Sequence, residues 1–226
     1  FKGNFEYAAD LWVMETDGEN AKRLTFDVIN WSSHPSWHPD GRQILYESAS
    51  TTDKFESFIR SVNIDGTNHR ILINNTGDHD RFPCMNPSDT SKIAYHYDPD
   101  NWPYFSQIRI YDQISKTNSL LVDNNGWADG PFSFSPDGKM LLWSETENGD
   151  EMRLRTMNRT TRAIKTISTA KGEDCLVTGK FDPTGNFIFY LRRSGTAYTE
   201  IIRCKSDGSS PAVLYYDNNI NCLNVI

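Results

Sequence analysis

Short apolar segments alternate with turn residues along the whole chain, and they recur at a nearly constant spacing. Four prolines, Pro39, Pro87, Pro136 and Pro183, stand in similar surroundings and lie 48, 49 and 47 residues apart. An apolar segment follows each of them, at residues 43–47, 92–97, 140–144 and 187–191. Short apolar runs between turn residues are typical of β-strands. A fixed period of this length indicates a repeat architecture, and no window favours a helix.

Each of these prolines opens a tight turn. The sequence is Pro-Asp-Gly at residues 39–41 and 136–138, Pro-Thr-Gly at 183–185 and the degenerate Pro-Ser-Asp at 87–89. Proline presets φ for such a turn, aspartate tolerates it, and glycine adopts the positive φ that it needs. The pattern predicts a hairpin between a short strand before the proline and a longer strand after it.

Two further strands are predicted in each repeat. A third strand falls at residues 11–14, 58–62, 108–111, 152–155 and 201–204, and a fourth at 22–25, 70–73, 119–122, 164–167 and 212–215. Asp-Gly turns separate them at residues 17–18, 65–66 and 207–208. Four antiparallel strands per repeat are the pattern of a propeller blade, so the sequence predicts an all-β protein, a β-propeller.

One stretch resembles a known family. Residues 11–25 read Leu-Trp-Val-Met-Glu-Thr-Asp-Gly-Glu-Asn-Ala-Lys-Arg-Leu-Thr, which is similar to the TolB-type, WD-like propeller repeat. That repeat continues with Pro-x-Trp-Ser-Pro-Asp-Gly, and His38 stands here where the pattern has serine. The third and fourth repeats depart from it, with residues 113–117 and 158–161 in place of the Asp-Gly turn. The resemblance implies a periplasmic or extracellular bacterial protein, and it says little about activity because such repeats serve many functions.

The number of blades follows from the repeat positions. We expect residues 1–226 to form a single domain with five blades, the last closed by strands from both termini. Strict repeat geometry leaves a gap of roughly ten residues at this closure. Known propellers have about 4–8 blades, so other blade numbers are possible. A six-bladed ring, or a segment of a longer propeller, therefore stays open as an alternative.

Composition and charge exclude several classes of protein. The net charge is −7 and no block of basic residues occurs, which argues against a nucleic-acid partner. No apolar run is long enough to span a membrane. The four cysteines, Cys84, Cys175, Cys204 and Cys222, lack the spacing of a zinc site, and we interpret them as free thiols. Neither a Gly-x-Ser-x-Gly motif nor a glycine-rich phosphate loop is present, and we predict no cofactor.

Polar and aromatic residues gather in the loops that enter each innermost strand. These loops open on one face of a propeller, around the mouth of its central channel. Tryptophan faces beside carboxylates and an arginine suit a polar ligand. The candidate ligand-binding residues are Trp31, His34, His79, Arg81, Trp127, Asp129 and Glu173. The alternative for the two tryptophans is simple packing between blades, which we also expect for Trp37, His38 and Phe134.

Three hypotheses on function remain at this point. The first is a non-catalytic propeller that binds a protein or a glycan through the channel-mouth face. The second is a metal-dependent lyase or hydrolase acting on acidic oligosaccharides, since oligogalacturonate lyases resemble these propellers and use histidines at the channel mouth. His34 and His79 are the residues that would serve there, although their ligand set cannot be matched to this sequence. The third is the regulatory propeller of a larger peptidase.

Overall fold

The computed structural model describes residues 9–26, 30–50, 56–75, 78–99, 106–123, 126–128, 131–147, 151–172, 174–194 and 198–217. Their regular structure consists of strands, from β1 to β19. In this part of the chain there is no helix that is long and apolar enough to cross a membrane. The predicted all-β class is confirmed.

The strands form four blades, which we call A to D. Blade A consists of β3 (Asn30–Trp37), β4 (Gln43–Ser50), β5 (Ser57–Asn63) and β6 (Arg70–Ile73), and blade B of β7 (His79–Met85), β8 (Lys92–Asp98), β9 (Gln107–Asp112) and β10 (Thr117–Asp123). In blade C, β11 (Gly126–Ala128) and β12 (Ser133–Phe134) share the innermost position, followed by β13 (Met140–Glu147), β14 (Glu151–Asn158) and β15 (Ile164–Lys171). Blade D consists of β16 (Asp174–Phe181), β17 (Phe187–Ser194), β18 (Tyr198–Lys205) and β19 (Ala212–Asp217). All pairs within the blades are antiparallel, as predicted.

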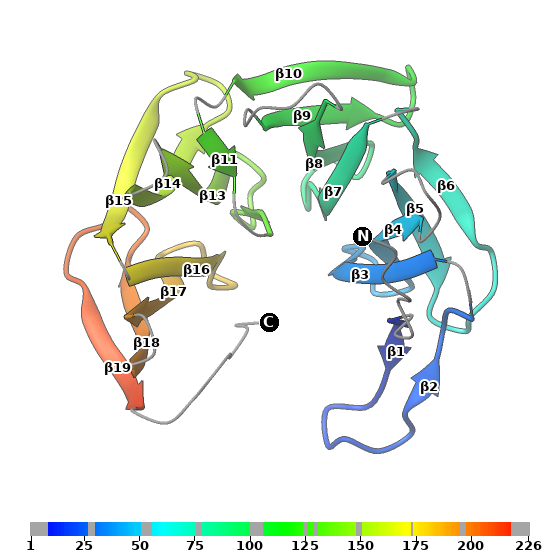
Figure 1. Ribbon diagram of the computed structural model, residues 1–226, viewed down its shortest axis with the longest axis horizontal. Helices are drawn as coiled ribbons and strands as arrows, with labels where there is room; N and C mark the ends of the chain where they lie inside the picture. Colours follow the sequence, from blue (N-terminus) through cyan, green and yellow to red (C-terminus); the bar gives the residue numbers. More distant parts are fainter. Residues whose placement is uncertain are drawn as a thin grey trace, which may run out of the picture.

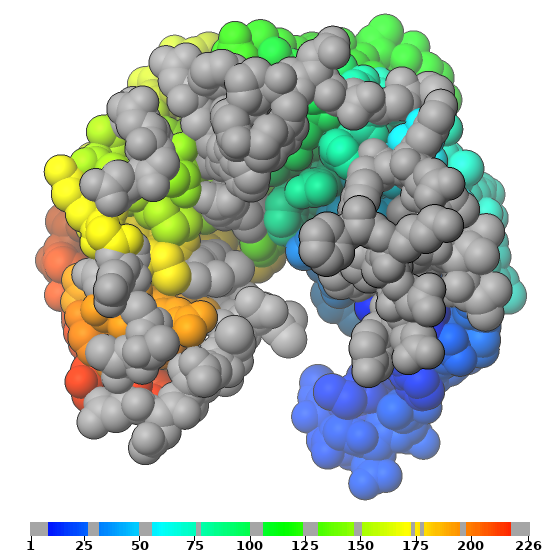
Figure 2. Space-filling model, viewed as in Figure 1, coloured from blue at the N-terminus to red at the C-terminus, as the bar shows by residue number. Residues whose placement is uncertain are grey.

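A smaller unit precedes blade A, in which β1 (Trp12–Val13) pairs with β2 (Lys22–Arg23). The blades and this unit follow one another around an arc, with the first strand of each blade towards the centre and the last at the rim (Figure 1). Among the described residues the arc is open between blade D and the β1–β2 unit (Figure 2), and this unit packs on blade A. The predicted closing blade depends on residues 1–8 and 218–226, which lie outside the described residues.

The predicted turns fix the ends of the hairpins. Gly41, Gly138 and Gly185 have φ values of 68°, 68° and 75°, a region that side chains disfavour. In the blade C turn, the Asp137 carboxylate accepts hydrogen bonds from the Lys139 amide at 3.0 Å and the Ser135 hydroxyl at 2.6 Å. The Pro-x-Gly pattern therefore forms these turns for the reason that its chemistry indicates.

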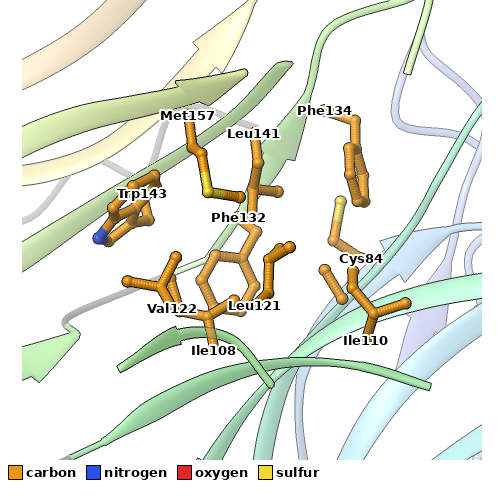
Figure 3. Close-up of a cluster of buried hydrophobic side chains, with 11 residues drawn as sticks. Cys84, Ile108, Ile110, Leu121, Val122, Phe132, Phe134, Leu141, Trp143 and Met157 are labelled. Carbon is orange, nitrogen blue, oxygen red and sulfur yellow. The ribbon is translucent and has the colours of Figure 1, made fainter. Parts of the chain in front are cut away.

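The hydrophobic core lies between neighbouring blades, because each sheet buries its faces against the next one. One apolar cluster fills each junction, from the β1–β2 unit with blade A to blade C with blade D. Figure 3 shows the junction of blades B and C, where Trp143 and Phe132 pack against Ile108 and Val122. Burying one such side chain contributes roughly 1.5–3 kcal/mol.

Trp37 is the exception to the expected packing. It ends the innermost strand of blade A and is 54% exposed, whereas Phe134 at the corresponding position of blade C is buried. The prediction of a packing role for Trp37 is therefore wrong in the described structure.

Candidate functional site

Two innermost strands carry a β-bulge at corresponding positions. The register of β3 shifts between Ser33 and Ser36, and that of β7 between Arg81 and Cys84. His34 and Phe82 lie in these bulges with φ values of 49° and 50°, which is uncommon for residues other than glycine. A bulge turns a side chain out of the regular alternation. Here it brings the two rings together, with 4.1 Å between their centres.

The buried carboxylate of Glu47 links blade A to blade B. Glu47 lies in β4 with 7% of its side chain exposed, and its Oε2 is 2.7 Å from His34 Nδ1 in β3. Its other oxygen is 3.8 Å from Arg81 Nε in β7. A buried charge is costly unless such partners compensate for it. The carboxylate thereby fixes one histidine and one arginine from two different blades.

Both partners of Glu47 also reach solvent. The side chain of His34 is 41% exposed and that of Arg81 is 39% exposed. Arg81 Nε lies 4.0 Å from the Asp98 carboxylate, which is weaker than a direct hydrogen bond, and it makes no hydrogen bond of its own. We call Glu47, His34, Arg81 and Asp98 the Glu47 cluster. Glu47 holds the two nitrogen-bearing side chains, His34 and Arg81, while both stay partly exposed. This arrangement suits a ligand with acceptor oxygens.

A series of rings continues from the cluster through blade B towards blade C. Phe82 meets His96 edge-on at 5.3 Å between ring centres, and His96 meets Phe132 at 4.8 Å. His96 is 1% exposed, and its Nε2 makes no hydrogen bond. Burial lowers the pKa of His96 to about 3, and the positive charges of Arg81 and His34 act in the same direction. The imidazole is therefore neutral at physiological pH.

The opposite side of β7 carries a second buried acid. Asp80 is fully buried and accepts hydrogen bonds from the backbone amide of Asn75 at 3.0 Å and from its side-chain amide at 2.7 Å. Burial raises the pKa of Asp80 to about 6, against the effect of these hydrogen bonds. Because side chains alternate along a strand, Asp80 points away from its neighbour Arg81 and does not join the Glu47 cluster.

The structure places the predicted residues as follows. His34 and Arg81 meet on Glu47, while His79 begins β7 in register with Asp98. Trp31 lies in β3 and Trp127 in β11, but their side chains are outside the described part. Asp129 and Glu173 also lie outside it. Those that are placed belong to strands and not to the entering loops, because the bulges let β3 and β7 continue past Pro35 and Pro83.

Sequence reasoning missed Glu47, His96 and Asp98. A signal for Glu47 was available, since the residues at the corresponding repeat positions are His96, Ser144 and Leu191. Within the described ranges, no group of three His, Cys, Asp or Glu side chains is arranged to hold a metal ion. The three described cysteines, Cys84, Cys175 and Cys204, are free thiols, and Cys222 lies outside the described residues.

Comparisons with known proteins bear on the fold. No protein-family model matches the sequence, and no curated protein matches it. Similar solved structures include TolB from Acinetobacter baumannii, with a TM-score of 0.74 and 18% identity over 91% of this chain and 48% of that one. A nidogen/laminin complex matches with a TM-score of 0.68 and 13% identity over 92% of this chain and 71% of that one. An oligogalacturonate lyase in complex with manganese matches with a TM-score of 0.65 and 13% identity over 91% of this chain and 58% of that one.

The chain thus spans about half the length of the Acinetobacter TolB that it matches. At these identities the comparisons establish the fold, which is that of TolB-type and other β-propeller proteins.

Proposed function

Starting from this shared propeller fold, we propose that the protein is a non-catalytic binding module whose binding surface includes the Glu47 cluster. The carrying observation is the Glu47 carboxylate, which holds His34 and Arg81 from two blades while each keeps about two fifths of its side chain exposed. Groups that are held in place before binding lose little freedom on binding. The partner would be a protein or a glycan that presents carboxylate or hydroxyl oxygens.

The charges of the cluster limit this choice of partner. The net charge of −7 makes the protein as a whole repel anions. Within the Glu47 cluster the carboxylates of Glu47 and Asp98 offset the charge of Arg81, so hydroxyl oxygens of a glycan or a protein suit it at least as well as a carboxylate. The resemblance of residues 11–25 to the TolB-type repeat supports a location outside the cytoplasm, where glycans and surface proteins occur.

Replacing Arg81 with alanine is expected to weaken binding of the partner about tenfold or more, because a hydrogen bond to a charged group contributes about 1.5–3 kcal/mol. A glycan array and a screen of purified extracellular proteins would first identify the ligand, and calorimetry would then compare the variants. Arg70→Ala is the matched control, since Arg70 begins β6 on the outer part of blade A and bonds only locally, to Asn68.

Glu47→Gln provides the second arm of this test. It keeps the shape of the side chain but removes the charge that orients His34 and Arg81, so it should weaken binding as well. If Arg81→Ala, Glu47→Gln and Arg70→Ala all bind like the unmodified protein, the Glu47 cluster is not the binding surface.

A lyase is the alternative that the similarity to oligogalacturonate lyase keeps open. Its test is incubation with oligogalacturonate and Mn²⁺, followed by the ultraviolet absorbance of an unsaturated product. Product formation that is lost on removal of the metal would overturn the non-catalytic proposal.

For the architecture, we propose a five-bladed ring in which β1 and β2 belong to the closing blade. A crystal structure of the natural protein with a sixth four-stranded sheet between blade D and the β1–β2 unit would contradict this count.

A further inference from the structure

A cavity of about 590 Å³ lies between blades C and D, which is within the range of small-ligand sites. It is lined by the hairpin turns of both blades, among them Pro136 and Asp137 of blade C and Gly185, Ser206 and Asp207 of blade D. The turns at Pro136 and Gly185 follow the innermost strands, and the turn at Ser206 follows the third strand of blade D. Because the strands alternate in direction, these turns lie at the same end of the blades, whereas the loops that enter the innermost strands lie at the other face of a propeller. The cavity is therefore on the face opposite to the entering loops.

The repeat explains why this space is empty of side chains. Blade D repeats blade C with an offset of 47 residues, which relates Phe181 to Phe134 (181 − 134), Ser206 to Arg159 (206 − 159) and Gly185 to Gly138 (185 − 138). The backbone confirms the relation, since Arg159 N donates to Lys139 O and Ser206 N donates to Asn186 O at equivalent points of the two blades. A long cationic side chain in blade C thus corresponds to a short hydroxyl in blade D.

Arg159 fills the corresponding space between blades B and C. Its Nη1 donates to the carbonyl oxygen of Gly138 at 2.9 Å, and its guanidinium carbon lies 5.4 Å from the centre of the Phe134 ring. Burial lowers the pKa of Arg159, while the nearby carboxylate of Asp89 acts in the opposite direction. A guanidinium therefore covers the aromatic ring and caps the hairpin turn in this junction.

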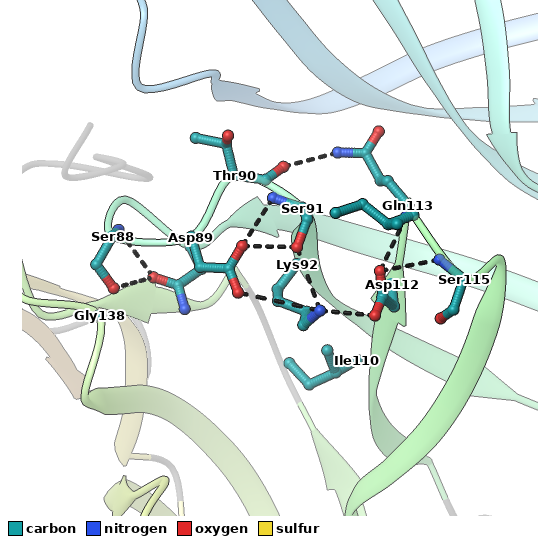
Figure 4. Close-up of polar contacts among 12 residues, drawn as sticks. Ser88, Asp89, Thr90, Ser91, Lys92, Ile110, Asp112, Gln113, Ser115 and Gly138 are labelled. Atoms are coloured by element: carbon teal, nitrogen blue, oxygen red, sulfur yellow. Dashed lines mark hydrogen bonds and ion pairs between the residues drawn. The ribbon is translucent and has the colours of Figure 1, made fainter.

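In blade B a different side chain occupies the corresponding space. Gln113 stands at the position of Arg159 and donates from Nε2 to the carbonyl oxygen of Thr90 at 2.8 Å (Figure 4). The same nitrogen lies 3.9 Å from the sulfur of Met85, which takes the place of Phe134. Both blades therefore cover an apolar side chain with a planar polar group that donates to a turn carbonyl. Ser206 is too short to do so over Phe181.

We propose that the cavity between blades C and D binds a guanidinium group from outside the chain, in the place that Arg159 occupies one blade earlier. The guanidinium lies over Phe181, as a cation over an aromatic face, and donates to the carbonyl of Gly185. Asp137 and Asp207 supply two negative charges, which are offset in part by Lys165 at the cavity wall and by Lys139, whose ammonium lies 3.6 Å from the Asp137 carboxylate. The planar, multiply donating guanidinium fits this arrangement better than the ammonium of lysine.

The probe for the test is N-acetyl-L-arginine amide, with N-acetyl-L-lysine amide as the comparison, both titrated by calorimetry. We expect the arginine derivative to bind one site, and Phe181→Leu to weaken it about fivefold through loss of the aromatic face. Ser206→Arg should abolish binding and raise the melting temperature, because the new side chain fills the cavity as Arg159 does. Equal binding to Ser206→Arg and to the unmodified protein, or equal binding of the lysine derivative, would overturn the proposal.

A reciprocal variant keeps the test decisive if Ser206→Arg fails to fold. Arg159→Ser should open the corresponding space over Phe134, lower the melting temperature, and create a second site whose occupation by the arginine derivative restores part of that loss. Absence of any such restoration would also count against the proposal. Agmatine and acetyl-Gly-Arg-Gly-amide then distinguish a free guanidino compound from an arginine side chain of a partner protein.

Discussion

Replacing Gly138 with alanine is expected to destabilise the protein by about 3 kcal/mol or more, whereas Gly41→Ala should cost only about 1–2 kcal/mol. Both glycines follow Pro-Asp and both have a φ of 68°, so the backbone strain of the substitution is the same. A methyl group at Gly41 meets nothing within 4 Å. A methyl group at Gly138 would lie 2.1 Å from Asn86 Oδ1 and 2.1 Å from Ser88 Oγ of blade B.

Of the two neighbours of Gly138, Ser88 is exposed, but Asn86 has little room to move away. Asn86 is fully buried, and its Oδ1 accepts hydrogen bonds from the amide and hydroxyl of Ser88, both at 3.0 Å. Figure 4 shows Ser88 next to Gly138. Relief of the clash would break these bonds or separate blades B and C, which is why we expect more than the cost of strain.

Urea unfolding followed by tryptophan fluorescence would measure both variants. Adding Ser88→Gly to Gly138→Ala should recover part of the loss, while adding it to Gly41→Ala should not, because only the first pair is in contact. Equal losses for the two alanine variants would mean that blades B and C do not touch at this turn.

The contrast between these glycines shows which features of the fold can be predicted from the sequence. The repeat around Pro39, Pro87, Pro136 and Pro183 was sufficient to predict the hairpins, since turn chemistry is local. Gly41 and Gly138 look identical at that level. Only the position of the preceding blade distinguishes them, and that position depends on contacts between residues about 50 apart in the sequence.

The candidate site shows the same limit. His34 and Arg81 were predicted from their types and positions, but Glu47 was counted as part of an apolar strand. Its role depends on two bulges, and the sequence near Pro35 and Pro83 does not reveal on which side of the strand His34 and Phe82 will lie. Ser206 and Arg159 differ in the sequence, but only the cavity between blades C and D shows what this difference does.

The buried groups on the two sides of β7 predict opposite responses of stability to acid. The pKa of His96 is lowered from 6.5 to about 3 on folding, so the unfolded chain binds a proton that the folded chain does not between these values. Stability is then lost as the pH falls from 6.5 towards 3. The pKa of Asp80 is raised from 3.8 to about 6, so the folded chain holds the extra proton, and this contribution is lost as the pH rises from 3.8 through 6.

In the unmodified protein the two contributions oppose each other between pH 3.8 and 6. Removing either group by substitution therefore separates the two contributions to stability. Replacing His96 with phenylalanine, which suits the rings of Phe82 and Phe132, removes the loss at low pH. Relative to the unmodified protein, the free energy of unfolding of this variant should rise by about 4 kcal/mol between pH 7 and pH 3, at 1.36 kcal/mol per unit of pKa.

Asp80→Asn should respond in the opposite direction. It removes the group that stabilises the fold at low pH, so its free energy of unfolding relative to the unmodified protein should fall by about 3 kcal/mol between pH 7 and pH 3.5. Unfolding in urea at half-unit steps of pH would measure both curves. Subtracting the curve of the unmodified protein cancels other carboxylates such as Asp112, whose pKa is lowered mainly by a hydrogen bond from Lys92. Two difference curves with the same sign would contradict the burial of one of these groups, because a neutral buried imidazole and a protonated buried carboxyl must respond oppositely.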